Sequence, residues 1–291
     1  MDTIKKLLIG LPLLALLCAC SPITALNVLT PRGDTVVSTG LAYGDGPRRL
    51  LDVYRPASAR GAAPVIVFFY GGNWVAGERG DYAFVGRALA ARGMVVVIAD
   101  YRLYPEVRYP AFLDDAAQAV AWAAREAGRY GGDPRRLYVM GHSAGAYNAA
   151  MVALEPRLLA PFAMAPSALR GWIGMAGPYD FLPIENPTTR PVFHYPDTPR
   201  TSQPVAHVTA ASPPALLMAP ERDKLVDPLR NTTAMAALLR ARGVAVTERH
   251  YGRVSHTTLV ASLAAPTRWL APALDDIEQF VKETGRSEGG E

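Results

Sequence analysis

The sequence predicts an α/β domain in which a mostly parallel sheet carries helices on both faces, after an opening antiparallel hairpin. Short, continuous apolar runs recur along the chain, as is typical of strands that are buried on both faces. Segments with helical periodicity separate these runs, which favours parallel strands joined by helices. The 291 residues, half of them hydrophobic and 19% charged, suffice for one large domain, and no internal repeat divides them.

The hairpin is predicted from residues 36–43 and 49–54, which alternate imperfectly between apolar and polar side chains. Glycine, aspartate and proline in the segment 44–47 provide the turn between them. Apolar runs then predict the buried strands. They are residues 65–69, 94–99, 137–140, 172–175, 215–218 and 244–250.

Helices are predicted between these strands, and Gly93 and Gly243 suit the ends of two of them. The predicted helices are residues 82–92, 111–127, 144–154, 232–242 and 274–283. Asp114 and Asp115 near the start of the second helix are expected to interact with its dipole. The proline-rich residues 181–214 are expected to form a small irregular cap between two core strands, because loops this long tend to be functional.

The N-terminus has the pattern of a secretion signal. Lys5 and Lys6 precede an apolar run over residues 7–19, which is too short to span a bilayer but suits a signal peptide. The run ends in Leu-Cys-Ala-Cys, which resembles the bacterial lipoprotein box. We therefore expect a signal peptide over residues 1–19, an acylated Cys20 and a tether over residues 20–33. Ordinary cleavage a few residues later is the alternative.

If Cys20 is acylated, the protein is anchored by its lipid to a bacterial membrane, on the periplasmic or cell-surface side. Cys18 and Cys20 are the only cysteines, so the domain expected over residues 34–284 has no disulfide, thiol nucleophile or thiolate metal site. The net charge is only +4 and the arginines are scattered, so we expect no nucleic-acid partner. Residues 285–291 are expected to be a disordered tail.

The segment Gly141-His142-Ser143-Ala144-Gly145 follows a predicted strand and opens a predicted helix. This is the context of a G-x-S-x-G nucleophile elbow, which places Ser143 on a sharp turn. Side chains at Gly141 and Gly145 would collide with neighbouring backbone. The N-terminus of the following helix directs free N–H groups and its positive dipole end at developing negative charge. We therefore expect Ser143 to be a nucleophile.

A second glycine motif, residues 70–74, follows the strand predicted over residues 65–69. Its two glycines free the backbone to turn N–H groups towards the nucleophile. Hydrolases of this type complete the oxyanion hole from such a loop and from the residue after the serine. The expected donors are Gly71, Gly72 and Ala144.

A serine hydroxyl needs a base within hydrogen-bond reach. In this arrangement the chain order is serine, then aspartate or glutamate, then histidine. His256 lies just past the last predicted strand and is expected to be the base. His250 lies within that strand, which favours packing. His194 and His207 fall in the proline-rich segment and are expected at the surface.

Two aspartates are candidates for the acid. Asp223 comes first after the strand predicted over residues 215–218. Asp227 precedes a proline and has the pattern of a helix N-cap. We favour Asp223, which would fix the imidazole tautomer and stabilise the imidazolium without taking the proton itself.

Four motifs, spread over about residues 41–285, resemble those of the bacterial esterases grouped with hormone-sensitive lipase and of the kynurenine formamidase and feruloyl/acetylxylan esterase branch. They are Gly71-Gly72-Asn73-Trp74 with Gly77, Asp100-Tyr101-Arg102-Leu103 with Pro105-Glu106, residues 141–145, and Ser255-His256. The resemblance implies an α/β-hydrolase fold in which Asp100 and Arg102 brace the site without reacting. Those families usually begin the glycine motif with histidine, where this chain has Tyr70. We expect the Tyr70 ring to pack under the oxyanion loop.

The resemblance further implies a serine carboxylic-ester hydrolase that forms an acyl-enzyme with a small-molecule ester, such as a small, aryl or acetyl ester, and needs no metal or cofactor. Trp74, Tyr179 and Phe181 are expected to line its pocket, although aromatic residues at these positions are also compatible with a core. An amidase, such as an arylformamidase, would use the same machinery. A non-catalytic lipoprotein of hydrolase fold is the alternative from a different class.

Overall fold

A computed structural model of the chain describes residues 22–60 and 63–285. Within these residues eight strands form one sheet in the order β1-β2-β4-β3-β5-β6-β7-β8. The pairs β1/β2 and β2/β4 are antiparallel and all other pairs are parallel, which confirms the predicted fold class. The strands are β1 Thr35–Ala42, β2 Leu50–Pro56, β3 Ala63–Phe69, β4 Val95–Ala99, β5 Gly132–His142, β6 Leu169–Met175, β7 Ala215–Pro220 and β8 Val246–Tyr251.

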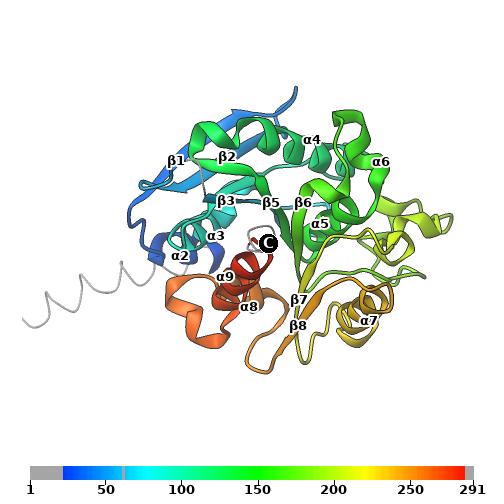
Figure 1. The fold of residues 1–291 in the computed structure, drawn as a ribbon. Coiled ribbons are helices and arrows are strands. Elements are labelled where there is room, and N and C mark those ends of the chain that lie inside the picture. Colours follow the sequence, from blue (N-terminus) through cyan, green and yellow to red (C-terminus); the bar gives the residue numbers. More distant parts are fainter. Residues whose placement is uncertain (1–21, 61–62, 286–291) are drawn as a thin grey trace, which may run out of the picture.

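Helices cover both faces of the sheet. The longer ones are α3 Ala83–Ala90, α4 Ala111–Glu126, α5 Ala144–Leu154, α7 Ala234–Ala241 and α9 Ala273–Thr284, with the shorter α2 Pro22–Leu29, α6 Pro156–Leu159 and α8 His256–Ala261. In Figure 1, α2, α3, α8 and α9 lie on one face, and α4, α5, α6 and α7 lie on the other. None of the helices in the described part of the chain combines the length and the apolar character that crossing a bilayer needs.

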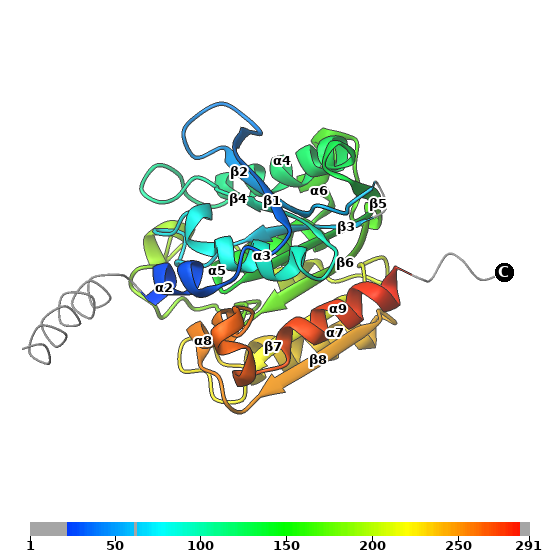
Figure 2. The same ribbon diagram turned by 90° about the vertical axis from the view of Figure 1, so that its left-hand side faces the viewer.

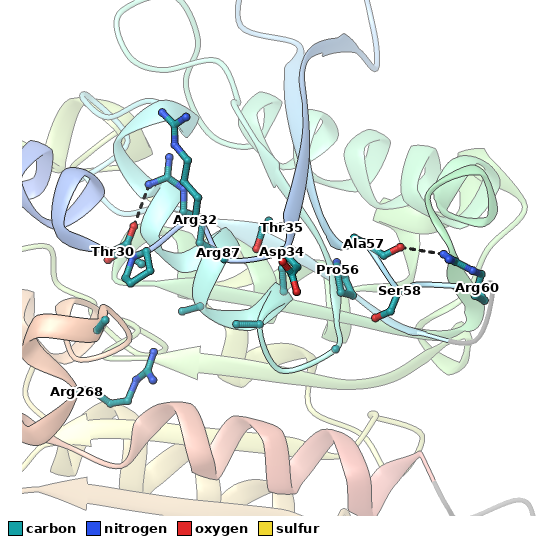
Figure 3. Close-up of a pocket in the computed structure, with 17 residues that line it drawn as sticks. Thr30, Arg32, Asp34, Thr35, Pro56, Ala57, Ser58, Arg60, Arg87 and Arg268 are labelled. Carbon is teal, nitrogen blue, oxygen red and sulfur yellow. Dashed lines mark hydrogen bonds between the residues drawn. The ribbon is translucent and has the colours of Figure 1, made fainter.

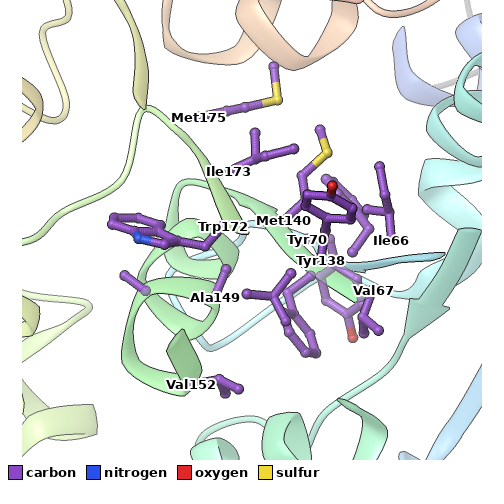
Figure 4. Packing of buried hydrophobic residues seen from close by; sticks show 14 of the residues in the cluster. Ile66, Val67, Tyr70, Tyr138, Met140, Ala149, Val152, Trp172, Ile173 and Met175 are labelled. Carbon is purple, nitrogen blue, oxygen red and sulfur yellow. The ribbon is translucent and has the colours of Figure 1, made fainter. Parts of the chain in front are cut away.

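The central strands are buried on both faces, which explains their continuous apolar runs. In the parallel register, Val67 of β3 lies between Val97 of β4 and Val139 of β5. Figure 4 shows how side chains of β3, β5, β6 and α5 fill the space between the layers. Because β3, β5, β6 and β7 are parallel neighbours, their carboxyl ends meet at one edge, where sites of this architecture form.

The segment expected to be a tether, residues 20–33, is folded over most of its length. Residues 22–29 form α2, and the Asn27 side chain fixes this helix to the domain. Its amide donates to the Gly80 and Asp81 carbonyls, and its oxygen accepts the Phe84 N–H. Ile23 and Leu26 pack against the core, and this burial, which depends on a distant part of the chain, is what the sequence did not reveal.

The signal peptide, Cys20 and residues 286–291 lie outside the described residues. The cap expected over residues 181–214 is a largely irregular segment with three short 3₁₀ helices, between β6 and β7.

Asp115 was expected to interact with the dipole of α4, but only Asp114 lies in the first turn of that helix, and Asp115 is fully buried. Its carboxylate accepts hydrogen bonds from the backbone and guanidinium of Arg102 and from the guanidinium of Arg49. These bonds join α4 to the segment after β4 and to the start of β2. A buried carboxylate needs such charged partners, because desolvation of an unpaired charge is costly.

Candidate active site

Ser143 lies between β5 and α5 in a backbone conformation that side chains rarely adopt, with φ 55° and ψ −122°. The chain can make this turn because glycines flank it. A Cβ at Gly141 would lie 2.1 Å from the Gly145 carbonyl oxygen, and a Cβ at Gly145 would lie 2.0 Å from the Phe69 carbonyl oxygen. Both contacts are far shorter than atoms tolerate, so both positions require glycine. The turn therefore presents Ser143 at the edge where the parallel strands end.

Three residues from distant parts of the chain meet at this edge. Ser143 Oγ lies 2.8 Å from His256 Nε2, and His256 Nδ1 lies 2.7 Å from Asp223 Oδ2. His256 is the first residue of α8, and Asp223 follows β7. This is the order nucleophile, base, acid that activates a serine hydroxyl.

Hydrogen bonds favour the charged form of the Asp223 carboxylate. Burial raises its pKa, but the hydrogen bond from His256 and those from the N–H groups of Leu225 and Val226 hold the pKa below its ordinary value. Since its side chain is wholly buried, the carboxylate interacts with the imidazole with little competition from water.

Asp227 occupies a different position. Its Oδ1 accepts the backbone N–H groups of Leu229 and Arg230, at the start of the helical turn Leu229–Thr233 that leads into α7. These are the contacts of the helix cap expected from the sequence. The structure thus brings Asp223, rather than Asp227, to the imidazole.

The remaining histidines after Ser143 lie elsewhere. His250 is not a packing residue: it is partly exposed on β8 and pairs with Glu248. His194 is exposed, as expected. His207 is mostly buried rather than at the surface, because its Nδ1 lies 2.8 Å from a carboxylate oxygen of Glu155, a partner close to it only in the fold.

His142 lies in the site, and the sequence analysis gave it no role. Its Nε2 lies 2.9 Å from the backbone oxygen of His256. Burial lowers the pKa of His142 to about 3, so the ring is neutral at neutral pH. Since a carbonyl only accepts, Nε2 must carry the proton and donate it. His142 therefore fixes the loop of the base to the turn of the nucleophile.

Gly71, in the glycine motif that follows β3, was expected to be an oxyanion donor. Gly71 is buried and does not line the pocket beside Ser143, whereas Asn73 does. The expected role of Gly71 as an oxyanion donor therefore stays a prediction. What the structure shows is close approach, because a Cβ there would lie 3.0 Å from the Ser143 Cβ.

The next residues form a tight turn at the site. Gly72 has φ 129°, and a Cβ there would lie 2.1 Å from the Ala76 carbonyl oxygen. Asn73 and Trp74 also have positive φ, and both line a pocket together with Ser143 and Ala144. Asn73, which the sequence analysis did not name as a donor, thus lies at the pocket beside Ser143. Its signal in the sequence was its place directly after the paired glycines.

Tyr70 lies beneath this loop. Its hydroxyl donates to Asp100 Oδ1 at 2.9 Å and accepts from Arg48 Nη2 at 2.8 Å. Its ring stacks on Tyr101 and Tyr82, with centroids 4.8 and 5.7 Å apart. Burial raises the pKa of Tyr70 far above its ordinary value, so the hydroxyl stays protonated and can donate.

Asp100 and Arg48 also hydrogen-bond residues that follow the loop and residues of the segment after β4. Asp100 also accepts from the backbone and guanidinium of Arg79, and Arg48 donates to the carbonyl oxygens of Gly77 and Tyr101. Neither Asp100 nor Arg102 lines the pocket: Asp100 bonds Tyr70 and Arg79, and Arg102 bonds Asp115.

A pocket of about 180 Å³ opens beside Ser143. Trp74 and Phe181 line it, as expected, and the cap supplies one wall. Tyr179 does not line it: the side chain is fully buried and packs edge-on against Trp172 in the core. The other lining residues include Pro183, Ile184, Glu185, Asn186 and Thr189 of the cap and Leu225, Val226 and Arg230 of the segment after β7.

Within residues 22–60 and 63–285, no group of three histidine, cysteine, aspartate or glutamate side chains is arranged to hold a metal ion.

The chain was compared with known proteins. The profile of the BD-FAE family matches residues 51–239, which include Ser143 and Asp223. The chain is 36% identical over 151 residues to a probable isoprenylcysteine alpha-carbonyl methylesterase, ICMEL1, of Oryza sativa subsp. japonica, covering 50% of this chain and 36% of that protein. It is 32% identical over 219 residues to Esterase LipC of Mycobacterium tuberculosis, covering 68% and 54%. The chain thus spans about a third to a half of these relatives.

Among solved structures, the chain is similar to a thermostable esterase from Pseudomonas putida ECU1011. The two share 26% sequence identity and a TM-score of 0.69, over 92% of this chain and 89% of that one. The likeness therefore extends over nearly all of the chain.

The two aspartates can be separated by substitution. We expect Asp223→Asn to lower kcat by about 10⁴-fold, because an amide cannot hold the imidazole in the required tautomer. Asp227→Asn should change kcat by less than about tenfold, since its oxygen can still cap the helical turn. Steady-state turnover of a chromogenic ester by both variants measures the difference. A larger loss in Asp227→Asn than in Asp223→Asn would reverse the assignment.

Removing the Tyr70 hydroxyl should loosen the oxyanion loop. We expect Tyr70→Phe to lower kcat by about tenfold with little change in KM, since a misplaced donor matters most in the transition state and a lost donor costs about 10²–10³. Tyr138→Phe is the matched control, because that buried hydroxyl donates to the Val281 carbonyl of α9 and makes no contact with the oxyanion loop. Equal kcat values in wild type and Tyr70→Phe would restrict Tyr70 to packing.

Proposed function

The chain belongs to the BD-FAE family of α/β-hydrolase proteins, and from this premise we propose that it is a serine hydrolase that cleaves carboxylic esters through an acyl-enzyme. The observation that carries the proposal is the unbroken hydrogen-bonded series from Ser143 through His256 to Asp223, at the N-terminus of α5. Such a series has no evident structural purpose on a turn that is itself strained.

In the proposed reaction, Ser143 Oγ attacks the ester carbonyl carbon while His256 Nε2 takes the hydroxyl proton. The Asp223 carboxylate stabilises the imidazolium that forms. His256 then gives the proton to the departing alcohol oxygen, which leaves an acyl group on Ser143. Water, deprotonated by the same imidazole, attacks this acyl group, and the acid leaves as Ser143 regains its proton.

The negative charge on the carbonyl oxygen needs donors that are already in place. We assign this role to the backbone N–H of Ala144, at the first turn of α5, and to the N–H groups of Gly72 and Asn73. Ala144 and Asn73 line the pocket beside Ser143. The buried Tyr70–Asp100–Arg48 network supports the loop that carries the Gly72 and Asn73 donors.

The small volume of the pocket supports a substrate with a short acyl group. Its volume of about 180 Å³ is below the range of roughly 300–1,000 Å³ usual for drug-sized ligands. Such a volume suits an acetyl or similarly short acyl chain, with the alcohol extending outwards over Trp74 and Phe181. An aryl alcohol would gain contact area from these two rings.

Replacement of the nucleophile tests the proposal. Ser143→Ala should lower ester turnover by about 10⁶-fold and abolish labelling by a fluorophosphonate probe, because the attacking oxygen is gone. Ser58→Ala, at an exposed serine, should keep both. The assay should compare aryl esters of increasing acyl length with formylkynurenine. Preferred cleavage of the formamide would make the protein an amidase, and wild-type turnover by Ser143→Ala would exclude both reactions.

We also propose that Cys20 is acylated and anchors the protein to a bacterial membrane, on the periplasmic or cell-surface side. The support is the sequence Leu-Cys-Ala-Cys at the end of the apolar run. A fatty-acid analogue fed to the producing cells should label the wild type and Cys18→Ala, but not Cys20→Ala. An unlabelled, freely released wild type would mean ordinary secretion.

A further inference from the structure

We propose that α2 and the neighbouring 3₁₀ helix η9, residues Ala265–Leu270, form a surface that docks onto anionic lipid headgroups of the bilayer. The proposal rests on the proposed acylation of Cys20, because the anchor is what brings this surface to a membrane.

The first support is an exposed apolar cluster. Val28 and Leu29 of α2 are 77% and 61% exposed, and Trp269 of η9 is 70% exposed. The two helices are in contact, and Figures 1 and 2 both place them side by side. Tryptophan favours the interface between water and lipid, where its apolar ring and polar N–H are both accommodated. Water alone is a poor environment for such a cluster.

The second support is the distance to the anchor. Cys20 precedes the first residue of α2 by two positions, and two residues span at most about 7 Å. The Asn27 hydrogen bonds to Gly80, Asp81 and Phe84 fix α2 to the domain. An acyl chain on Cys20 would therefore hold the domain against the bilayer by the end that carries α2, with almost no slack.

The third support is charge. A pocket of about 740 Å³ lies next to α2, and its charged lining residues are one carboxylate, Asp34, and four guanidinium groups, including those of Arg32, Arg87 and Arg268 (Figure 3). Within residues 22–60 and 63–285, no carboxylate forms an ion pair with any of the three. The Arg87 guanidinium donates to the backbone oxygen of Asn27, which orients it beside α2. Guanidinium groups bind phosphate through paired hydrogen bonds, so the pocket suits a phospholipid headgroup.

The docked orientation would also place the active site close to the lipid. Helix α8, which begins with His256, contacts η9. Figure 2 shows α2 and α8 at the end of the sheet to which the parallel strands point. An ester that resides in the membrane interface would then be near the pocket that contains Ser143.

Fluorescence of Trp269 tests the surface directly. The other three tryptophans are buried, so a quencher in the lipid should reach only Trp269. The protein isolated from the exporting cell is placed with vesicles of phosphatidylglycerol and brominated phosphatidylcholine in equal amounts. We expect the bromine to quench part of the emission of the wild type and none of the emission of Trp269→Phe.

A matched pair of substitutions controls for general effects of an exposed leucine. Leu29→Ser should reduce the quenching, whereas Leu229→Ser should leave it unchanged, since Leu229 is 71% exposed but lies next to α7, on the other face of the sheet. With protein that carries no acyl chain, Arg32→Gln and Arg268→Gln should each weaken partition onto these vesicles by about fivefold.

The outcomes separate the surface from the anchor. A Cys20-labelled protein whose Trp269 is not quenched would overturn the surface and leave the anchor intact. Quenching in a protein without the label would support the surface and remove the anchor. A dimer that becomes a monomer in Leu29→Ser, without quenching in the wild type, would overturn the proposal in favour of a second copy of the chain.

Discussion

The site depends on the close approach of three backbone segments around Ser143. Gly141, Gly145 and the carbonyl of Phe69 pack so tightly that no side chain fits between the ends of β3 and β5 and the first turn of α5. This contact forces the serine into its strained conformation and aims the N-terminus of α5 at the substrate. The large apolar core of the central sheet offsets the strain, so the position of the nucleophile is set by packing rather than by its own hydrogen bonds.

Around this fixed point, the other chemical groups are held by separate means. Asp223 and His256 come from the ends of β7 and β8, and His142 connects the loop of the base to the serine turn. The oxyanion loop instead rests on Tyr70 and the charged groups behind it. In the resembling families a histidine usually occupies the position of Tyr70. Here a phenol, kept protonated by burial, makes the hydrogen bonds that support the loop.

The fold class was predictable because buried strands, helix ends and the nucleophile turn each have a local pattern in the sequence. Ser143, Asp223 and His256 follow from chain order and from their places after strands, and the structure brings them together. What the sequence did not reveal depends on distant contacts. Helix α2 is stabilised by α3 and the segment before it, and Tyr179 and Trp172 pack together in the core.

The two halves of the sheet therefore have different tasks. The half that contains β2, β3 and β4 carries the oxyanion loop and its buried ionic network. The half that contains β6, β7 and β8 carries the cap, the acid and the base. Strand β5 lies between the two halves, and Ser143 follows it directly, so the nucleophile lies next to the groups that both halves carry. Since a one-residue slip in a strand register would move the end of that strand by about 3 Å, the parallel register from β3 to β8 is what keeps a serine, a carboxylate and an imidazole from distant segments within hydrogen-bond reach.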